Sequence, residues 1–128
     1  MFVSFDVYFQ RFKDGDKASG GGEIVRQILQ PFIVRENPEQ NFALVEYGDG
    51  SVDVYLDGDS MLANHVGGEK PWDLLVEGAR AAGWVILPVG YQTCITEEAQ
   101  RFHLPEGLDQ DVSFVRSGEE LLQVIRSL

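Results

Sequence analysis

The chain has 128 residues, of which 44% are hydrophobic and 24% are charged, a composition typical of one folded domain rather than of a disordered segment. The 21 acidic against 10 basic residues give a net charge of −11, which disfavours binding to nucleic acid or to an anionic membrane because both need clustered Lys and Arg. The single cysteine allows no internal disulfide, and no stretch has the pattern of a signal peptide or the apolar length of a membrane span. We therefore expect a soluble cytoplasmic protein of the acidic kind that is common in bacteria.

The first elements expected along the chain are a strand, a loop and a helix. Alternation of apolar and polar residues over 3–10 is typical of a half-buried strand. Residues 13–22 are rich in glycine and aspartate and predict a flexible loop. Residues 23–33 then place apolar side chains at helical spacing, and Pro31 is expected to end or kink that helix.

The middle of the chain predicts a β-hairpin followed by the clearest helix. Two apolar segments, 42–47 and 51–57, are separated by a Gly-Asp-Gly turn, which tolerates the positive φ of a tight hairpin. A second turn leads to a third, short strand at 61–66. Residues 69–83 predict a helix, with a proline in its first turn and a glycine at its end.

The last quarter of the chain predicts a further strand and a closing unit. The almost wholly apolar segment 84–90 is typical of a central strand. A short helix over 96–104, a short strand over 112–115 and a helix over 117–128 follow, the last with the spacing of a capping box.

The order of these elements predicts the fold class. It matches the ferredoxin-like split βαβ pattern (βαββαβ) with a C-terminal β-α extension. We predict a single α+β domain over residues 1–128, with both long helices on one face of the sheet. In that topology the first strand and the strand 84–90 lie side by side at the centre of the sheet.

The segment 47–60, YGDGSVDVYLDGDS, carries four aspartates and resembles a calcium loop in composition. An EF-hand loop needs glycine at its sixth position and glutamate at its twelfth. Counting from Asp49 puts Val54 and Ser60 there, and counting from Asp57 fails as well. Because the alternating apolar residues demand an extended chain, we predict two turns and a strand rather than a metal site.

The same alternation predicts a surface for protein binding. If the helices cover one face of the sheet, the outward residues of the expected strands 3–10 and 51–57 share the other face. An acidic surface with interleaved tyrosines suits protein recognition, because tyrosine offers contact area with few rotors to freeze. The alternative is a merely solvated face. The predicted partner-binding residues are Asp6, Tyr8, Asp53, Tyr55 and Asp57.

Other polar side chains indicate no catalytic or metal chemistry. The neighbours of Cys94 include Glu97 and Glu98, which would raise the pKa of the thiol rather than lower it, so no catalytic residue is predicted. The spacing of Cys94, His65 and His103 fits no zinc motif, and neither a metal nor a cofactor is predicted.

Three functions stay open. The first is a small acidic, non-enzymatic protein-binding module that covers a basic partner protein, as an inhibitor does. In size and charge the chain is similar, as a class, to the immunity proteins that neutralise bacterial toxins, although it shares no motif with them. The second is a small-molecule-binding or enzymatic α+β domain, with an anion at the helix start after residue 68 or a pocket near the two histidines. The third is a homodimer that pairs strands or sheet faces. The candidate ligand residues of the second are His65, Tyr91, Glu98 and His103.

Overall fold

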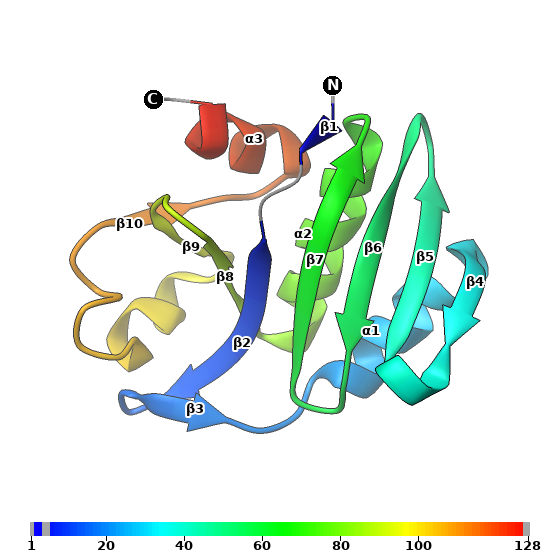
Figure 1. Cartoon of the computed structure of the whole chain (residues 1–128). Helices are drawn as coiled ribbons and strands as arrows, with labels where there is room; N and C mark the ends of the chain where they lie inside the picture. Colours follow the sequence, from blue (N-terminus) through cyan, green and yellow to red (C-terminus); the bar gives the residue numbers. More distant parts are fainter. Residues whose placement is uncertain (1, 4–5, 127–128) are drawn as a thin grey trace.

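The computed structural model describes residues 2–3 and 6–126, and it consists of one mixed sheet with helices packed against it (Figure 1). The helices are α1 (Gly22–Leu29), α2 (Lys70–Ala82) and α3 (Gly118–Arg126), with short 3₁₀ helices η1 (Gln30–Phe32), η2 (Pro38–Gln40) and η3 (Glu98–His103). The strands are β1 (Phe2–Val3), β2 (Val7–Lys13), β3 (Asp16–Ala18), β4 (Ile33–Asn37), β5 (Phe42–Tyr47), β6 (Gly50–Leu56), β7 (Ser60–Gly67), β8 (Val85–Pro88), β9 (Thr93–Ile95) and β10 (Val112–Phe114).

The sheet runs in the order β10-β9-β8-β2-β7-β6-β5-β4, with β1 added to β7 and β3 added to β2. Among the described pairs only β9 with β10 is parallel. The predicted α+β class is confirmed. The predicted neighbours at the centre are present as the β2–β8 pair. The sheet nevertheless has more strands than the ferredoxin-like pattern, and that specific topology is not established.

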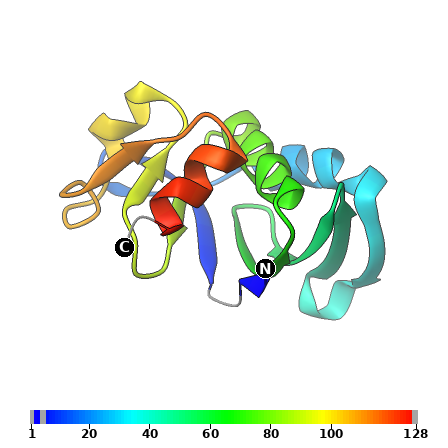
Figure 2. The same cartoon turned by 90° about the horizontal axis from the view of Figure 1, so that it is seen from above.

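The three α-helices lie side by side, and the sheet curves past them (Figure 2). Helix α2 contacts both α1 and α3, and it packs on β5, β6 and β7. The main core lies between these layers and includes both tryptophans, Trp72 and Trp84, which are fully buried. On β6 the predicted inward residues Val52 and Val54 are also fully buried. Among the described residues, no helix combines the length and the apolar character that a bilayer crossing requires.

A second, smaller core lies on the opposite face of the sheet. Residues alternate in direction along a strand, so Ile86 joins the main core while Val85 points the other way. Val85 packs with Ile95 and Leu104, beneath the segment that contains η3. The α-helices therefore keep to one face as predicted, but the expected short helix, which is a 3₁₀ helix, covers part of the other.

Several strands form where the sequence predicts loops. Residues 13–18, expected to be flexible, close a hairpin in which Lys13 pairs with Asp16. Its two turn residues, Asp14 and Gly15, have φ of 51° and 85°, the positive values that a two-residue hairpin turn needs. Strand β7, which the sequence predicts as a short strand over 61–66, is eight residues long.

Two parts of the predicted elements lie outside the described residues. These are residues 4–5 of the first expected strand and residues 127–128 of the closing helix.

Candidate functional site

Asp49, in the turn between β5 and β6, holds the start of α2. One oxygen of its carboxylate accepts a hydrogen bond from the backbone N–H of Lys70 at 2.8 Å, and both accept from that of Glu69 at 3.1 Å. These bonds, the one from Lys70 first, lower the pKa of Asp49 from its ordinary value. The helix start that the sequence offered as an anion site is therefore occupied by the protein's own carboxylate.

The turn between β6 and β7 uses two more aspartates in the same way. Asp57 Oδ1 accepts hydrogen bonds from the N–H groups of Asp59 at 2.7 Å and Ser60 at 2.8 Å. Asp59 Oδ1 accepts from the N–H of Gly20 at 2.7 Å. The predicted turns are thus confirmed. Asp57, predicted to lie on the sheet face, instead follows the end of β6 and closes its turn. Within residues 2–3 and 6–126, no group of His, Cys, Asp and Glu side chains is arranged to hold a metal ion.

Five side chains form a line across the sheet face opposite the α-helices. Cross-strand pairing places Leu87 opposite Tyr8 and Tyr8 opposite Leu62. Leu62 lies opposite Tyr55, and Tyr55 opposite Phe42. We call this line, which crosses β8, β2, β7, β6 and β5, the cross-strand row. In Figure 1 strands β7, β6 and β5 stand in front of α2, and no described helix packs on this side of them.

The cross-strand row offers aromatic contact area to solvent. Tyr8 is 44% exposed, and the other four members are half-buried. The rings of Phe42 and Tyr55 lie 5.3 Å apart, and the guanidinium of Arg35 stands 5.9 Å from the centre of the Phe42 ring. Such contacts hold the rings in place, so a binding partner would lose little side-chain freedom on docking.

A polar line runs beside the row, one pleat further along the same face. Asn64 lies opposite Asp53 and donates a hydrogen bond from Nδ2 to Asp6 Oδ1 at 3.1 Å. His65 Nδ1 lies 2.9 Å from Asp53 Oδ2. The structure therefore brings together four of the five predicted partner-binding residues: Asp6, Tyr8, Asp53 and Tyr55.

A groove of about 590 Å³ opens at the end of the cross-strand row formed by Leu87 on β8 and Tyr8 on β2. It lies where the loop after η3 rises from the sheet, and the β2–β3 hairpin forms its far wall. Its volume is within the usual range for ligand pockets, about 300–1,000 Å³. Two members of the row, Tyr8 and Leu87, line the groove. Its lining also includes Phe12, Lys17, Pro105 and Leu108.

The two histidines of the predicted ligand pocket lie apart. His65 is on the last part of β7, beside the start of β2 because the two strands run antiparallel. His103 contacts Asp14, in the turn that follows the far end of β2, with 3.2 Å between His103 Nδ1 and the backbone N of Asp14. Neither histidine lines this groove.

The other two candidate ligand residues have local roles. Tyr91 packs against the edge of the main core. Glu98 accepts a hydrogen bond from Arg101 Nε at 3.2 Å within η3. The four candidate ligand residues therefore do not form one site.

No known protein family, curated protein or solved structure matches this chain. What the site does must therefore follow from its own side chains.

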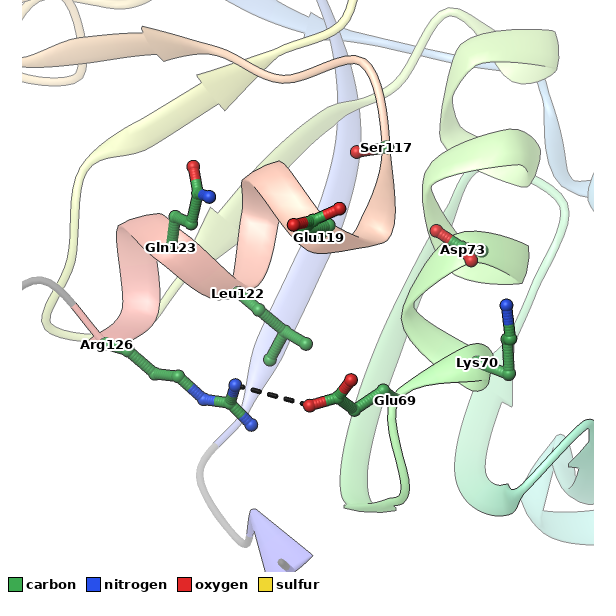
Figure 3. Close-up of a pocket in the computed structure, with 8 residues that line it drawn as sticks. All are labelled: Glu69, Lys70, Asp73, Ser117, Glu119, Leu122, Gln123 and Arg126. Atoms are coloured by element: carbon green, nitrogen blue, oxygen red, sulfur yellow. Dashed lines mark hydrogen bonds and ion pairs between the residues drawn. The ribbon is translucent and has the colours of Figure 1, made fainter.

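A second cavity, of about 800 Å³, lies between the start of α2 and α3 (Figure 3). Arg126 Nη1 reaches Glu69 Oε2 at 3.5 Å, and Asp73 Oδ1 accepts a hydrogen bond from the N–H of Gly118 at 2.8 Å. The lining carries both signs of charge, and three of its charged residues, Glu69, Asp73 and Arg126, bind within the chain. These contacts link the start of α2 to α3 across the cavity.

Cys94 is fully buried in β9, and burial raises the pKa of its thiol to about 12. Its Sγ lies 3.5 Å from the carbonyl oxygen of Gln92. At neutral pH the thiol therefore stays protonated and lacks the reactivity of a nucleophile.

The predicted partner-binding residues did not include three members of the cross-strand row: Leu62, Leu87 and Phe42. Leucine and phenylalanine are more often buried than exposed, so residue type alone does not indicate that they lie on a binding surface. Alternation along each strand gives the face of each residue, but the line itself depends on which strands are neighbours and in what register.

Proposed function

We propose that this protein is a non-enzymatic protein-binding module, of the immunity or inhibitor type, that covers a basic surface of a partner protein with the outer face of its sheet. The cross-strand row is the observation that supports this most. Interfaces between proteins have an aromatic and apolar centre with a polar rim, and the row with its polar line has that composition.

The charge of the protein supports a basic partner. Three acidic side chains lie on the same sheet face as the row. Asp6 and Asp53 belong to the polar line, and Glu46 lies opposite Ser51. The whole chain adds a net charge of −11. Complementary potentials speed the encounter of two proteins and disfavour acidic competitors.

The two alternatives have less support. A ligand pocket built on both histidines would need them close together, and they lie at different ends of β2 and β7. A tight homodimer would bring two chains of charge −11 into contact.

We also propose that strands β8, β2, β7 and β6, with α1 and α2, form a ferredoxin-like unit to which the remaining strands are added. The strand order supports this, and so does the place of each helix in the chain, α1 after β2 and α2 after β7. Such a unit would give the row a rigid platform.

Site-specific photocrosslinking in the cells that make this protein tests the module. A photocrosslinking amino acid replaces Tyr8 in one variant and Gln27, an exposed residue of α1, in the control. We expect one basic protein to crosslink at position 8 and not at position 27. The purified pair should then bind one to one, and Tyr8→Ala or Tyr55→Ala should each weaken binding about tenfold or more, as residues at the centre of an interface do. The same crosslinks at both positions, or affinity unchanged by both substitutions, would contradict the proposal.

A further inference from the structure

We propose that the groove at the Leu87 and Tyr8 end of the cross-strand row takes an apolar side chain that is flanked by lysine or arginine in an extended segment of the partner protein. This inference rests on the proposed function and names the chemistry that the partner must present there.

The surface of the groove is mainly apolar, although Gln10 and Ser60 also line it. Tyr8 and Leu87 enter it from the sheet, Phe12 from the β2–β3 hairpin, and Pro105 and Leu108 from the loop after η3. An apolar side chain that leaves water for such a surface gains roughly 25 cal/mol per Å² of buried area. The groove therefore favours an aliphatic or aromatic residue over a polar one.

Two carboxylates and one lysine lie in the groove lining or next to it in the chain. Asp16 lines the groove, and Glu106 lies between the lining residues Pro105 and Leu108. Both carboxylates are exposed and make no hydrogen bond or ion pair with another described residue. Lys17, which also lines the groove, offsets one of these two negative charges. Basic residues on either side of an inserted apolar side chain would meet this excess of negative charge.

Hydrogen bonds fix the walls of the groove relative to each other. The backbone N–H of Gly15 donates to the carbonyl oxygen of His103 at 3.1 Å, which joins the hairpin to η3. The N–H of Leu108 donates to the carbonyl oxygen of Pro105 at 3.1 Å and closes the turn on the other side. A groove that is already formed costs less to fill than one that must first be ordered.

The groove and the row form one continuous surface, because Tyr8 and Leu87 belong to both. A segment anchored in the groove would continue over Leu62 toward Tyr55. Anchors of this kind, an inserted side chain beside a flatter contact surface, carry much of the binding energy in protein interfaces.

The test uses three blocked tripeptides as probes: Lys-Phe-Lys, Glu-Phe-Glu and Lys-Ser-Lys. Each is titrated into ¹⁵N-labelled protein while the backbone amide resonances are followed by NMR. We expect Lys-Phe-Lys to shift the amides of Tyr8, Leu87 and Leu108 in a saturable manner, with a Kd of about 1 mM, equivalent to about −4 kcal/mol. The other two peptides should bind at least tenfold more weakly.

Substitutions on the rim and wall sharpen the test. Glu106→Lys, at an exposed position, should weaken Lys-Phe-Lys severalfold, whereas the matched control Glu119→Lys on α3 should leave it unchanged. Leu108→Asp should abolish the binding. Equal shifts with all three peptides, no shift at the groove amides, or shifts centred elsewhere would overturn the inference, and the Glu106 comparison decides even if the Leu108 variant fails to fold.

The two proposals fail in different ways. If the tripeptides bind as expected but position 8 crosslinks no partner, the module proposal falls and the groove inference stands as peptide recognition. If a partner crosslinks at position 8 and Glu106→Lys leaves its affinity unchanged, the groove inference falls and the module stands.

Discussion

Aspartate has different roles within the segment 47–60, and its place relative to the strand ends decides which. Asp49 and Asp59 lie in turns, and their carboxylates bind backbone N–H groups of distant segments. Asp53 lies inside β6, where the neighbouring backbone groups pair with other strands, and it meets His65 instead. A carboxylate that accepts hydrogen bonds from the backbone N–H groups of another segment links the two segments without a metal ion.

At the residue scale, Asp49→Ala should destabilise the fold by releasing the start of α2. We expect a lower midpoint in urea unfolding with an unchanged slope, because the substitution removes a helix cap and leaves the folded surface almost the same. Asp16→Ala is the matched control, since it removes the same charge from an exposed carboxylate without a described partner. Equal midpoints for the two variants would contradict the role of Asp49.

The contribution of Asp49 should also depend on pH with a definite sign. Its pKa is lowered in the folded protein, so the stabilisation is fully present above the pKa of the unfolded chain. It is lost as the pH falls through the lowered, folded value. The difference in urea midpoint between the wild type and Asp49→Ala should therefore shrink in acid below the ordinary aspartate pKa, while remaining constant near neutral pH.

At the scale of elements, the start of α1 meets the β6–β7 turn at a backbone contact. The N–H of Gly22 donates to the carbonyl oxygen of Gly58 at 3.0 Å. A Cβ at Gly22 would collide with the carbonyl oxygen of Asp57, so the helix can approach the turn only where a glycine stands. Trp84 Nε1 donates to the carbonyl oxygen of Gly20 at 2.9 Å and secures the loop before this helix.

Gly22→Ala should therefore destabilise the protein more than the same substitution at Gly58, the exposed glycine on the other side of this contact. We expect a loss of about 2 kcal/mol or more for Gly22→Ala, because backbone atoms must move apart to admit the methyl group. Gly58→Ala, whose Cβ would meet no atom within 4 Å, should stay within about 0.5 kcal/mol of the wild type. Equal losses in denaturant unfolding would show that the contact is looser than described.

At the scale of the whole molecule, the net charge opposes self-association and the cross-strand row favours it. The row is an apolar surface on the sheet face opposite the α-helices, which η3 covers only in part, and such surfaces promote association. The net charge of −11 opposes the approach of a second copy. Salt changes the balance, because it screens charges and leaves apolar contact in place.

We predict a monomer by analytical ultracentrifugation at about 50 mM salt and weak self-association at about 1 M, where the screening length falls to about 3 Å. Tyr8→Lys should remove that self-association, because it replaces the most exposed member of the row with a charged side chain. The same substitution at an exposed residue of α1, Gln27→Lys, should not. A stable dimer at low salt would instead favour the homodimer alternative.

The sequence by itself determined the elements whose pattern is local. Helices α1, α2 and α3 and strands β5 and β6 follow from the spacing of apolar residues and from the turn residues between them. The same alternation gave the faces of β6, with Val54 inward and Tyr55 outward. These features depend on interactions within a few residues along the chain, which is the range that periodicity and turn chemistry report.

Only the tertiary structure decided which segments meet. Strands β3 and β9 are three residues long and hold their extended form because a neighbour pairs with them. The cross-strand row joins segments from Tyr8 to Leu87, and the groove adds Leu108. Strand register is set by how the whole core packs, and a shift of one residue would turn every side chain to the other face. No local pattern contains that information, so the surface proposed for binding became visible only when the sheet was assembled.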